Sequence, residues 1–363
     1  MVNTSKTDFS NFRFLHDFVQ RMLPNNQVVA LATILLTGTL LIYALSGVLM
    51  PVFAAIVLAY LLEGLVVKVE HQKIPRLLAV IIVFCGFLTM FGFVLFVLIP
   101  IVSEQLVQLV HRIPEFVSSV QKEILRFPEK HPELITQTRI SQIVFAIQQS
   151  LLQYGQELIS ASAQSFANVL AAIIYLFLVP FMVFFFLKDK QVLLRWCAQF
   201  LPDERSLTIK VWEEVDLQIA NYIRGKFLEI FILWAASYIC FYWLDLNYAM
   251  LLAVLMGFSV LIPYVGATLV TIPVLAVAYL QWSGNNDSHF TYVLIAYSLI
   301  QAIDGVVLVP VLFSEAVNLH PVAIIIAILF FGGIWGFWGV FFAIPLATLV
   351  KAVLTAWPRL ERQ

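Results

Sequence analysis

The chain has 363 residues, of which 61% are hydrophobic and only 12% are charged. A soluble protein could not cover its surface with so few polar side chains, and a disordered chain or a disulfide-stabilised secreted domain is excluded as well. The 21 Lys and Arg nearly balance the 22 Asp and Glu, so the charge indicates no general affinity for nucleic acid. The composition is typical of a polytopic membrane protein.

Six apolar runs predict membrane spans, because about 20 apolar residues cross a bilayer as a helix. Pro51 separates the first run from the second, which contains Glu63, and Pro100 marks the end of the third. We therefore expect an all-α polytopic membrane protein whose first three spans occupy residues 28–102. The six runs are residues 28–49, 52–67, 77–102, 166–187, 227–244 and 290–313.

Two longer apolar runs contain an internal break. Residues 248–282 are interrupted by Ile262-Pro263-Tyr264-Val265-Gly266, and residues 321–357 are interrupted by a glycine-rich stretch. Each run is too long for one span and short for two, which predicts helical hairpins that are either re-entrant or fully crossing. With the six full spans this makes about 8–10 membrane helical segments. The glycines of the second break are Gly332, Gly333, Gly336 and Gly339.

Lys and Arg predict the orientation, because they concentrate on the cytoplasmic side of membrane proteins. Sixteen of the 21 basic residues fall in the tail 1–27, the loop 68–76, the segment 188–226 and the C-terminal end, including the tail 358–363. The remaining five lie in residues 103–165, a segment long enough to be translocated despite its charge. We therefore expect both chain ends in the cytoplasm.

The polar segment 103–165 has the pattern of an extracytoplasmic helical hairpin. Two apolar stripes at helical spacing are separated by Pro128 and Pro132. The two arms either pack on each other at the surface or form an oligomer contact, and a homo-oligomer is expected. The stripes are Leu106, Val110, Ile113, Val117, Val120, Ile124 and Phe127, then Ile140, Ile143, Ile147, Leu151, Tyr154 and Leu158.

The cytoplasmic segment 188–226 predicts one amphipathic helix. Leu207, Val211, Val215, Ile219 and Tyr222 recur at intervals of three and four residues. Such a helix lies on the membrane, packs under the spans or presents an ordinary solvated face.

No enzyme signature occurs in the chain. A Walker loop, H-E-x-x-H, G-x-S-x-G and C-x-x-C are all absent, and the six histidines are scattered. We expect no catalytic residue, no metal site and no cofactor.

The most informative feature is residues 227–350, which contain no Lys or Arg. Glu229 and Asp304 lie there within or beside apolar runs, as Glu63 does earlier in the chain. A carboxylate at membrane depth costs about 2.5–3.5 kcal/mol, so it must face protein or water, carry a proton or hold a cation. A salt bridge within this half is not expected, although Lys226 is placed to snorkel beside Glu229. A structural hydrogen-bonding role remains the alternative for each acid, and Gly305 favours a functional role for Asp304.

The two breaks offer backbone groups as well. Pro263 removes a donor and Gly266 relaxes the backbone, so freed carbonyls can coordinate a cation or a polar solute. Gly332 and Gly336 form a G-x-x-x-G pair, for which close helix packing is the alternative explanation. Two broken hairpins around one charged span indicate a transporter core.

The chain resembles the autoinducer-2 exporter family, also called PerM-like permeases, across most of its membrane portion. The most specific part of this resemblance is the C-terminal block that begins at Pro310 and ends at Gly339. Gly64 departs from the family pattern, because the family often has Pro at that position. The resembling motifs are residues 59–63, residues 74–79, Arg224-Gly225-Lys226, residues 262–266, Pro310, residues 317–321 including His320 and Pro321, residues 332–336 and Gly339.

The resemblance implies a bacterial inner-membrane transporter that exports autoinducer-2 or exchanges sodium or lithium for protons. We predict a secondary transporter for a small polar solute. A cation/proton antiporter is the alternative, and a non-transporting oligomeric scaffold is the alternative from another class. The candidate transport-path residues are Asp304, Glu229, Glu63, Pro263, Tyr264, Gly266, Pro310, His320 and Pro321, beside the four hairpin glycines.

Overall fold

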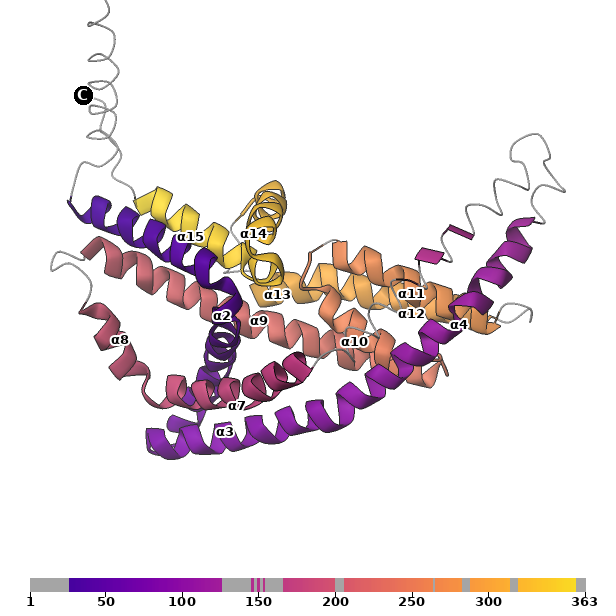
Figure 1. The fold of residues 1–363 in the computed structure, drawn as a ribbon, viewed down its shortest axis with the longest axis horizontal. Coiled ribbons are helices and arrows are strands. Elements are labelled where there is room, and N and C mark those ends of the chain that lie inside the picture. Colours follow the sequence, from indigo (N-terminus) through magenta and orange to yellow (C-terminus); the bar gives the residue numbers. More distant parts are fainter. Residues whose placement is uncertain are drawn as a thin grey trace, which may run out of the picture. The chain divides into compact units, whose positions relative to one another are not determined.

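The computed structural model describes residues 26–125, 145–146, 149–150, 153, 166–199, 206–263, 265–282, 288–313 and 319–356. These residues form helices joined by short turns, without any strand among them (Figure 1). Within them, six helices are long and apolar enough to cross a membrane. An all-α polytopic membrane protein is therefore confirmed. The six are Leu49–Glu70, Arg76–Glu115, Val215–Trp243, Val265–Trp282, His289–Phe313 and Pro321–Phe341.

The first two predicted spans are joined in one helix. Helix α2 (Asn26–Glu70) is continuous for 45 residues and contains Pro51. Pro51 therefore does not end the helix, whose ribbon bends along its course (Figure 1), and the candidate membrane span of this helix begins close to Pro51, at Leu49. Proline removes one hydrogen bond, but an apolar medium requires the remaining backbone groups to stay paired, so the helix bends rather than ends.

The third span continues well beyond its predicted end at Pro100. Helix α3 (Arg76–Phe93), the π-helical turn η1 (Val94–Leu98) and helix α4 (Ile99–Leu125) follow without interruption (Figure 1). The amide of Ile99 bonds to the Val94 carbonyl across the wide turn. This turn makes room for Pro100, which would clash with a carbonyl of a regular helix. The helical first arm of segment 103–165 is confirmed, whereas the break at 127–132 and the second stripe fall largely outside the described residues.

The fourth span is followed by a sharp bend. Helix α7 (Phe166–Lys188) matches the predicted run, and helix α8 (Lys190–Ala198) leaves it at 80°. Helix α9 (Ser206–Trp243) then joins the predicted amphipathic helix to the fifth span. The predicted boundary at residue 227 therefore lies inside one continuous helix and stays a prediction. The candidate span begins at Val215, because apolar residues continue through the stripe that was assigned to the cytoplasm.

Both predicted breaks are confirmed. Helix α10 (Ala249–Ser259) is too short to cross a membrane and is separated from α11 (Val265–Trp282) by a turn. Helix α14 (Pro321–Phe341) has a non-helical residue at Gly336, whose φ is 58°, and α15 (Ala343–Ala356) follows it. Between them, α12 (His289–Ile303), the π-helical turn η2 (Asp304–Leu308) and α13 (Val309–Phe313) form one irregular span.

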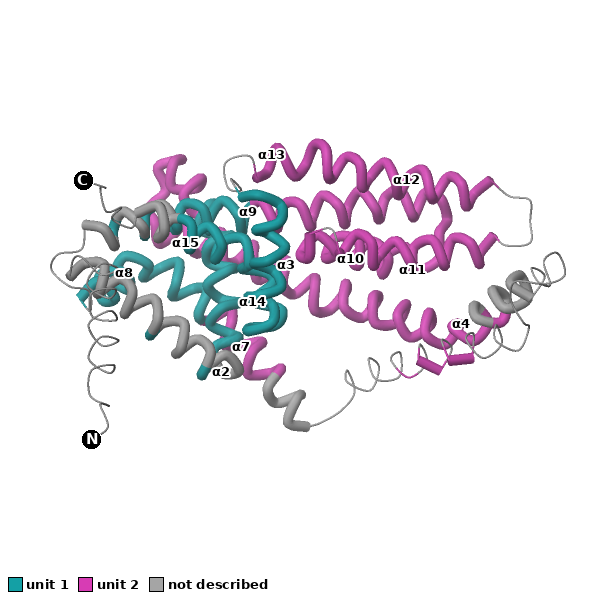
Figure 2. The backbone as a smooth tube through the Cα atoms, turned by 90° about the horizontal axis from the view of Figure 1, so that it is seen from above, with its two compact units in different colours: residues 1–64, 182–224, 315–363 teal, residues 65–181, 225–314 magenta. Residues whose placement is uncertain are grey.

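The chain divides into two compact units, shown in Figure 2. Unit 1 comprises residues 1–64, 182–224 and 315–363, and unit 2 comprises residues 65–181 and 225–314. In unit 2, α10 packs against α11 and α4, and α11 packs against α12, around buried Leu252, Met256 and Val274. In unit 1, α14 packs against α15, and the Tyr222 hydroxyl donates to the Phe341 carbonyl at 3.0 Å.

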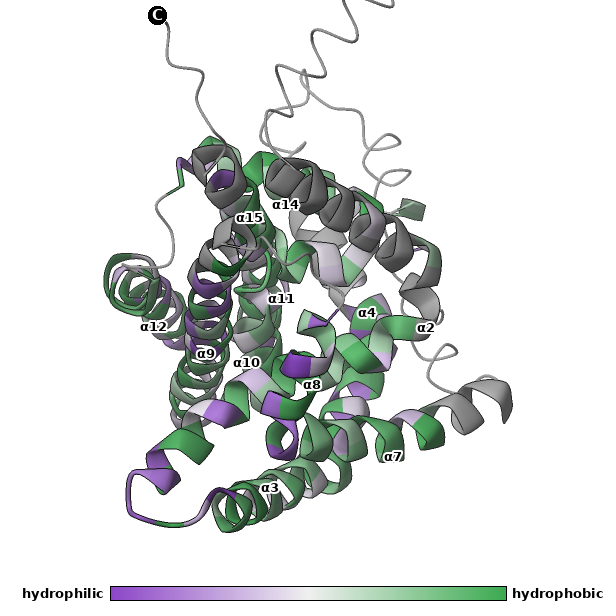
Figure 3. Ribbon diagram, turned by 90° about the vertical axis from the view of Figure 1, so that its left-hand side faces the viewer, coloured by the Kyte–Doolittle hydropathy of each residue, from purple (hydrophilic) through white to green (hydrophobic). Residues whose placement is uncertain are grey.

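Large apolar side chains cover the outer faces of the helices. Figure 3 shows α3 and α7 as predominantly hydrophobic, whereas hydrophilic bands recur along α9. Phe96 of η1 is 77% exposed and Phe177 of α7 is 72% exposed. Aromatic rings exposed to this extent are suited to contact with lipid tails. The hydrophilic bands of α9 make it the helix on which to search for a polar site.

Gly266→Ala is expected to destabilise the first break. A Cβ at this position would lie 1.8 Å from the Ser259 carbonyl oxygen, so the backbone of the turn must shift. We expect a loss of about 1–3 kcal/mol in unfolding free energy in detergent, as for other overpacked sites. The control is Gly92→Ala in α3, where nothing lies within 4 Å and the helix gains about 0.5–1 kcal/mol. Equal stability of the two variants would contradict the tight packing of the break.

Candidate functional site: a buried charge cluster

A buried ion pair lies on helix α9. Lys226 and Glu229 are separated by one helical turn, and the Lys226 Nζ lies 2.6 Å from the Glu229 Oε2. Their side chains are only 5% and 2% exposed. Glu229 also lies at the midpoint of the candidate span Val215–Trp243. Residues 227–350 contain no Lys or Arg, so no salt bridge was expected among them. Glu229 nevertheless forms one, because its cation is Lys226, the residue immediately before that stretch.

Lys226 is held in the interior of unit 2. Its ammonium donates to the Val260 carbonyl at 3.0 Å and lies 4.9 Å from the centre of the Phe313 ring. The predicted position of Lys226 beside Glu229 is therefore confirmed, but its ammonium group is buried rather than extended toward water. Val260 follows α10 just before the predicted break, so a carbonyl at this break does bind a cation, which is the protein's own ammonium group.

Asp304 completes the cluster from another helix. It is the first residue of the π-helical turn η2. Its carboxyl group lies close enough to that of Glu229 for the two to interact electrostatically, and the Lys226 charge acts on both. Two carboxyl groups beside one ammonium group form a neutral cluster only when one of the carboxyl groups holds a proton. The Asp304 Oδ1 is buried and has no hydrogen-bond partner among the described residues. Single π-helical turns within α-helices are frequent at functional sites.

A row of polar side chains extends from Asp304 along α12. Gln301 and Tyr297 share its face, one and two turns earlier, and the Gln301 amide donates to the Tyr297 hydroxyl at 3.2 Å. The Tyr297 hydroxyl lies 2.5 Å from the Thr271 Oγ1, and both hydroxyls lie 2.9 Å from the Ala267 carbonyl oxygen. Sequence reasoning missed these residues, although the spacing of Tyr297, Gln301 and Asp304 is itself a helical stripe.

The other predicted residues of unit 2 have different surroundings. Pro263 lies in the turn between α10 and α11, and Gly266, the second residue of α11, is buried against the Ser259 carbonyl. Pro310 lies exposed in α13. Tyr264 lies outside the described residues. The first break thus belongs to the cluster through the Val260 carbonyl, and Pro310 contributes to the irregular span rather than to the cluster.

Glu63, His320 and Pro321 belong to unit 1. Glu63 Oε1 lies 3.4 Å from the Lys190 Nζ, and this pair is partly exposed. His320 caps α14 by accepting a hydrogen bond from the Val322 amide, and Pro321 is the first residue of that helix. We expect both to be structural, because an N-cap and a first-turn proline are common at helix starts.

The hairpin glycines form a tight turn. Gly336 has a positive φ, which favours glycine. A Cβ at Gly339 would lie 1.9 Å from the Phe331 carbonyl oxygen, and one at Gly332 would lie 2.8 Å from the Val340 side chain. Gly333 has open space around it. The G-x-x-x-G pair therefore lets one hairpin fold on itself.

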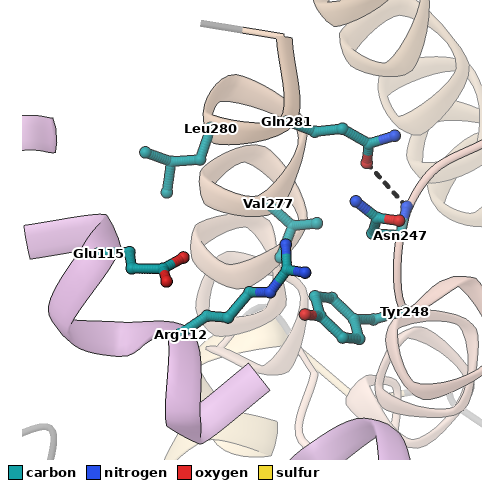
Figure 4. Close-up of a pocket in the computed structure, with 7 residues that line it drawn as sticks. All are labelled: Arg112, Glu115, Asn247, Tyr248, Val277, Leu280 and Gln281. Atoms are coloured by element: carbon teal, nitrogen blue, oxygen red, sulfur yellow. Dashed lines mark hydrogen bonds between the residues drawn. The ribbon is translucent and has the colours of Figure 1, made fainter. Parts of the chain in front are cut away.

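A cavity of unit 2 lies between α4 and the turn that joins α9 to α10 (Figure 4). Gln281 holds this turn, because its amide accepts from the Asn247 N–H at 2.8 Å and donates to the Asp245 carbonyl at 2.6 Å. Both charged side chains of the cavity are exposed. It is a weaker candidate than the buried cluster. The cavity of about 120 Å³ is lined by Arg112, Glu115, Asn247, Tyr248, Val277, Leu280 and Gln281.

Comparison with known proteins gives a consistent result. The family model "AI-2E family transporter" matches residues 31–359. The chain is 43% identical over 347 residues to "Putative permease PerM" of Escherichia coli (strain K12), covering 95% of this chain and 97% of the relative. It is 26% identical to "Putative transport protein YueF" of Bacillus subtilis (strain 168), covering 85% and 84%. It is 21% identical to "AI-2 transport protein TqsA" of Escherichia coli (strain K12), covering 85% and 86%.

Proposed function

Because the chain belongs to the AI-2E family of transporters, we propose that this multi-pass membrane transporter couples a small polar solute to a proton through Lys226, Glu229 and Asp304. The proximity of two buried carboxyl groups, those of Glu229 and Asp304, to the single ammonium group of Lys226 carries this proposal. We assign no catalytic residue, no metal and no cofactor. The scaffold hypothesis has no support, since the family is one of transporters.

The charge balance of the cluster explains how a proton would act. With one proton on the carboxyl pair, the cluster of one ammonium and one carboxylate is neutral. Loss of the proton leaves one excess negative charge in an interior of low dielectric constant, where uncompensated charge is costly. That charge favours a state in which water, a cation or a polar solute reaches the pair. Proton binding and release thereby stabilise different states of the transporter, which is the requirement for coupling.

Cation/proton exchange is the second candidate function. The buried Asp304 Oδ1 lacks a hydrogen-bond partner among the described residues, and the Val260 carbonyl already binds an ammonium group. A monovalent cation would use the same oxygens if Lys226 withdrew. For the solute of the first candidate, autoinducer-2 is the compound to assay first, because TqsA is named for transporting it.

Transport by the purified chain in liposomes tests the proposal. A trapped pH indicator reports proton movement while autoinducer-2, Na⁺ or Li⁺ is offered under an imposed pH gradient. We expect the gradient to dissipate when a transported solute is present. Dissipation by Na⁺ or Li⁺ alone would favour exchange of the cation. Solute movement without any response of the internal pH would contradict proton coupling.

We propose a bacterial inner-membrane location, with the basic segments and both chain ends in the cytoplasm. The excess of Lys and Arg in the tail 1–27, the loop 68–76, the segment 188–226 and the C-terminal end supports this orientation. Residues 103–165 would then lie outside.

Cysteines introduced at residues 130, 286 and 205 are expected to report this orientation. An impermeant thiol reagent added to intact cells should modify the first two variants and leave the third unreacted, because residue 205 lies in one of the basic segments assigned to the cytoplasm and residues 130 and 286 do not. Permeabilised cells are the control, in which all three should react. Modification at residue 205 in intact cells would reverse the orientation.

We also propose a homo-oligomer, but only the later part of the stripe at residues 106–127 remains available for the contact between chains. Val110 is buried, and α4 packs against α10 of the same chain, where Gln105 accepts a hydrogen bond from the Leu251 amide at 2.8 Å. This part of the stripe is therefore used within the chain. The later positions remain the proposed contact, and the mass of the purified protein in detergent tests whether it oligomerises.

A further inference from the structure

Unit 1 contains a cavity that the proposed coupling cluster does not use. Its volume is about 240 Å³, and it lies between α2, the end of α7, α8 and α9. A cavity of about 150 Å³ accommodates benzene, so this one is large enough for an aromatic ring with a short side chain. The 80° bend between α7 and α8 creates it, because the bend brings α8 beside the cavity while Leu187 stays buried at the end of α7.

The walls of the cavity are apolar, and its polar groups come from three helices. Ile56, Ala59, Tyr60 and Glu63 form one face of α2, since they recur at intervals of three and four residues. Lys190 comes from α8, and Asp216 comes from α9. Ligand sites typically combine such a predominantly apolar lining with a few converging polar groups.

The charges of the lining favour a cation. Two carboxylates, Glu63 and Asp216, face one ammonium, that of Lys190. The Tyr60 hydroxyl donates to Asp216, which stabilises that carboxylate. The Glu63 side chain is 13% exposed and that of Lys190 is 37% exposed, so the carboxylate lies deeper than its partner. An entering ammonium group can replace Lys190 at Glu63 and release it to water, because partly exposed ion pairs contribute little.

We infer that this cavity binds a small organic amine whose apolar body is about the size of a phenyl ring. The body contacts Leu187, Leu193 and Leu194, and the ammonium group contacts Glu63 and Asp216. The Trp212 ring lines the same cavity and adds a surface that attracts cations. This binding does not depend on the Lys226–Glu229–Asp304 cluster.

Calorimetric titration of the purified full-length protein in detergent tests the inference. The probes are 2-phenylethylamine, 2-phenylethanol and phenylacetate, which share a body and differ in charge, with protein-free micelles as the blank. We expect saturable binding of the amine to one site, at least about 10-fold weaker binding of the alcohol and none of the anion. Equal binding of amine and alcohol, stronger binding of phenylacetate, or no saturable binding of the amine would each overturn the inference.

Three variants locate the site. Glu63→Gln should weaken amine binding at least about 10-fold, whereas Glu104→Gln, a change at an exposed acid of α4, should leave it unchanged. Leu194→Trp keeps every charge and fills the cavity, so it should abolish amine binding even if Glu63→Gln folds poorly. Asp304→Asn should bind the amine as the native protein does. Native affinity in Glu63→Gln or Leu194→Trp, or lost affinity in Asp304→Asn, would overturn the assignment.

Discussion

Asp304→Asn is expected to abolish proton-coupled flux in liposomes while leaving the folded protein and its membrane insertion intact. Asparagine keeps the size of the side chain and most of its capacity for hydrogen bonding, but it cannot release a proton. We expect a loss of at least about 100-fold, the lower end of what a positioned proton-transfer group contributes. The measurement is the initial rate of internal pH change in liposomes containing equal amounts of protein.

Asp245→Asn is the matched control for this change. Asp245 is exposed in the turn before α10 and has a φ of 54°, a conformation that Asn adopts readily. Its flux should equal that of the native protein. Native flux through Asp304→Asn would remove Asp304 from the mechanism and leave Glu229 and Glu63 as the remaining acids. Loss of the folded protein in Asp304→Asn would instead indicate a structural role.

Lys226→Met is expected to destabilise the protein severely. The change leaves the Glu229 carboxylate buried without its cation, and removal of one partner of a buried ion pair typically costs about 3–5 kcal/mol. Methionine keeps most of the volume of lysine, so the effect reports the lost charge rather than a cavity. The free energy of unfolding in detergent measures it.

A second variant and a control separate charge from packing. Lys226→Met combined with Glu229→Gln should recover most of the lost stability, because a neutral amide is much cheaper to bury than an unpaired carboxylate. Lys190→Met removes the cation from Glu63 in unit 1, where the pair is partly exposed, and should cost no more than about 1 kcal/mol. Equal losses in Lys226→Met and Lys190→Met would contradict the burial of the cluster.

The sequence predicted the fold class of the protein and the positions of the breaks in its two helical hairpins. Apolar runs of span length predicted the helices, because only helices satisfy every backbone group inside a bilayer. Pro263, Gly266 and the glycines around Gly336 predicted the two breaks, because these residues interrupt a helix through their own covalent structure. Glu229 and Asp304 were candidates because a carboxylate in an apolar run requires a partner.

Local sequence patterns did not predict the ends of the helices correctly, because the requirement to pair backbone groups in an apolar medium is stronger than the local signals. Pro51 and Pro100 indicated helix ends, yet the chain continues as helix through both, because unpaired backbone groups in an apolar medium cost more than a bend or a π-helical turn. The stripe of 207–222 indicated a separate cytoplasmic helix, yet α9 runs through it into the span. A periodic pattern shows which face is apolar but does not show where a continuous helix enters the membrane.

The sequence by itself determined that this is an all-α membrane protein with two broken hairpins and acids at membrane depth, since these properties depend on composition and local backbone chemistry. Only the tertiary structure decided which groups meet. Lys226 is buried rather than snorkelling because Val260 and Phe313, both distant in sequence, receive its ammonium group. Glu229 and Asp304 lie near the same ammonium group because separate helices bring them together, and proximity across helices follows from packing, which no local pattern encodes.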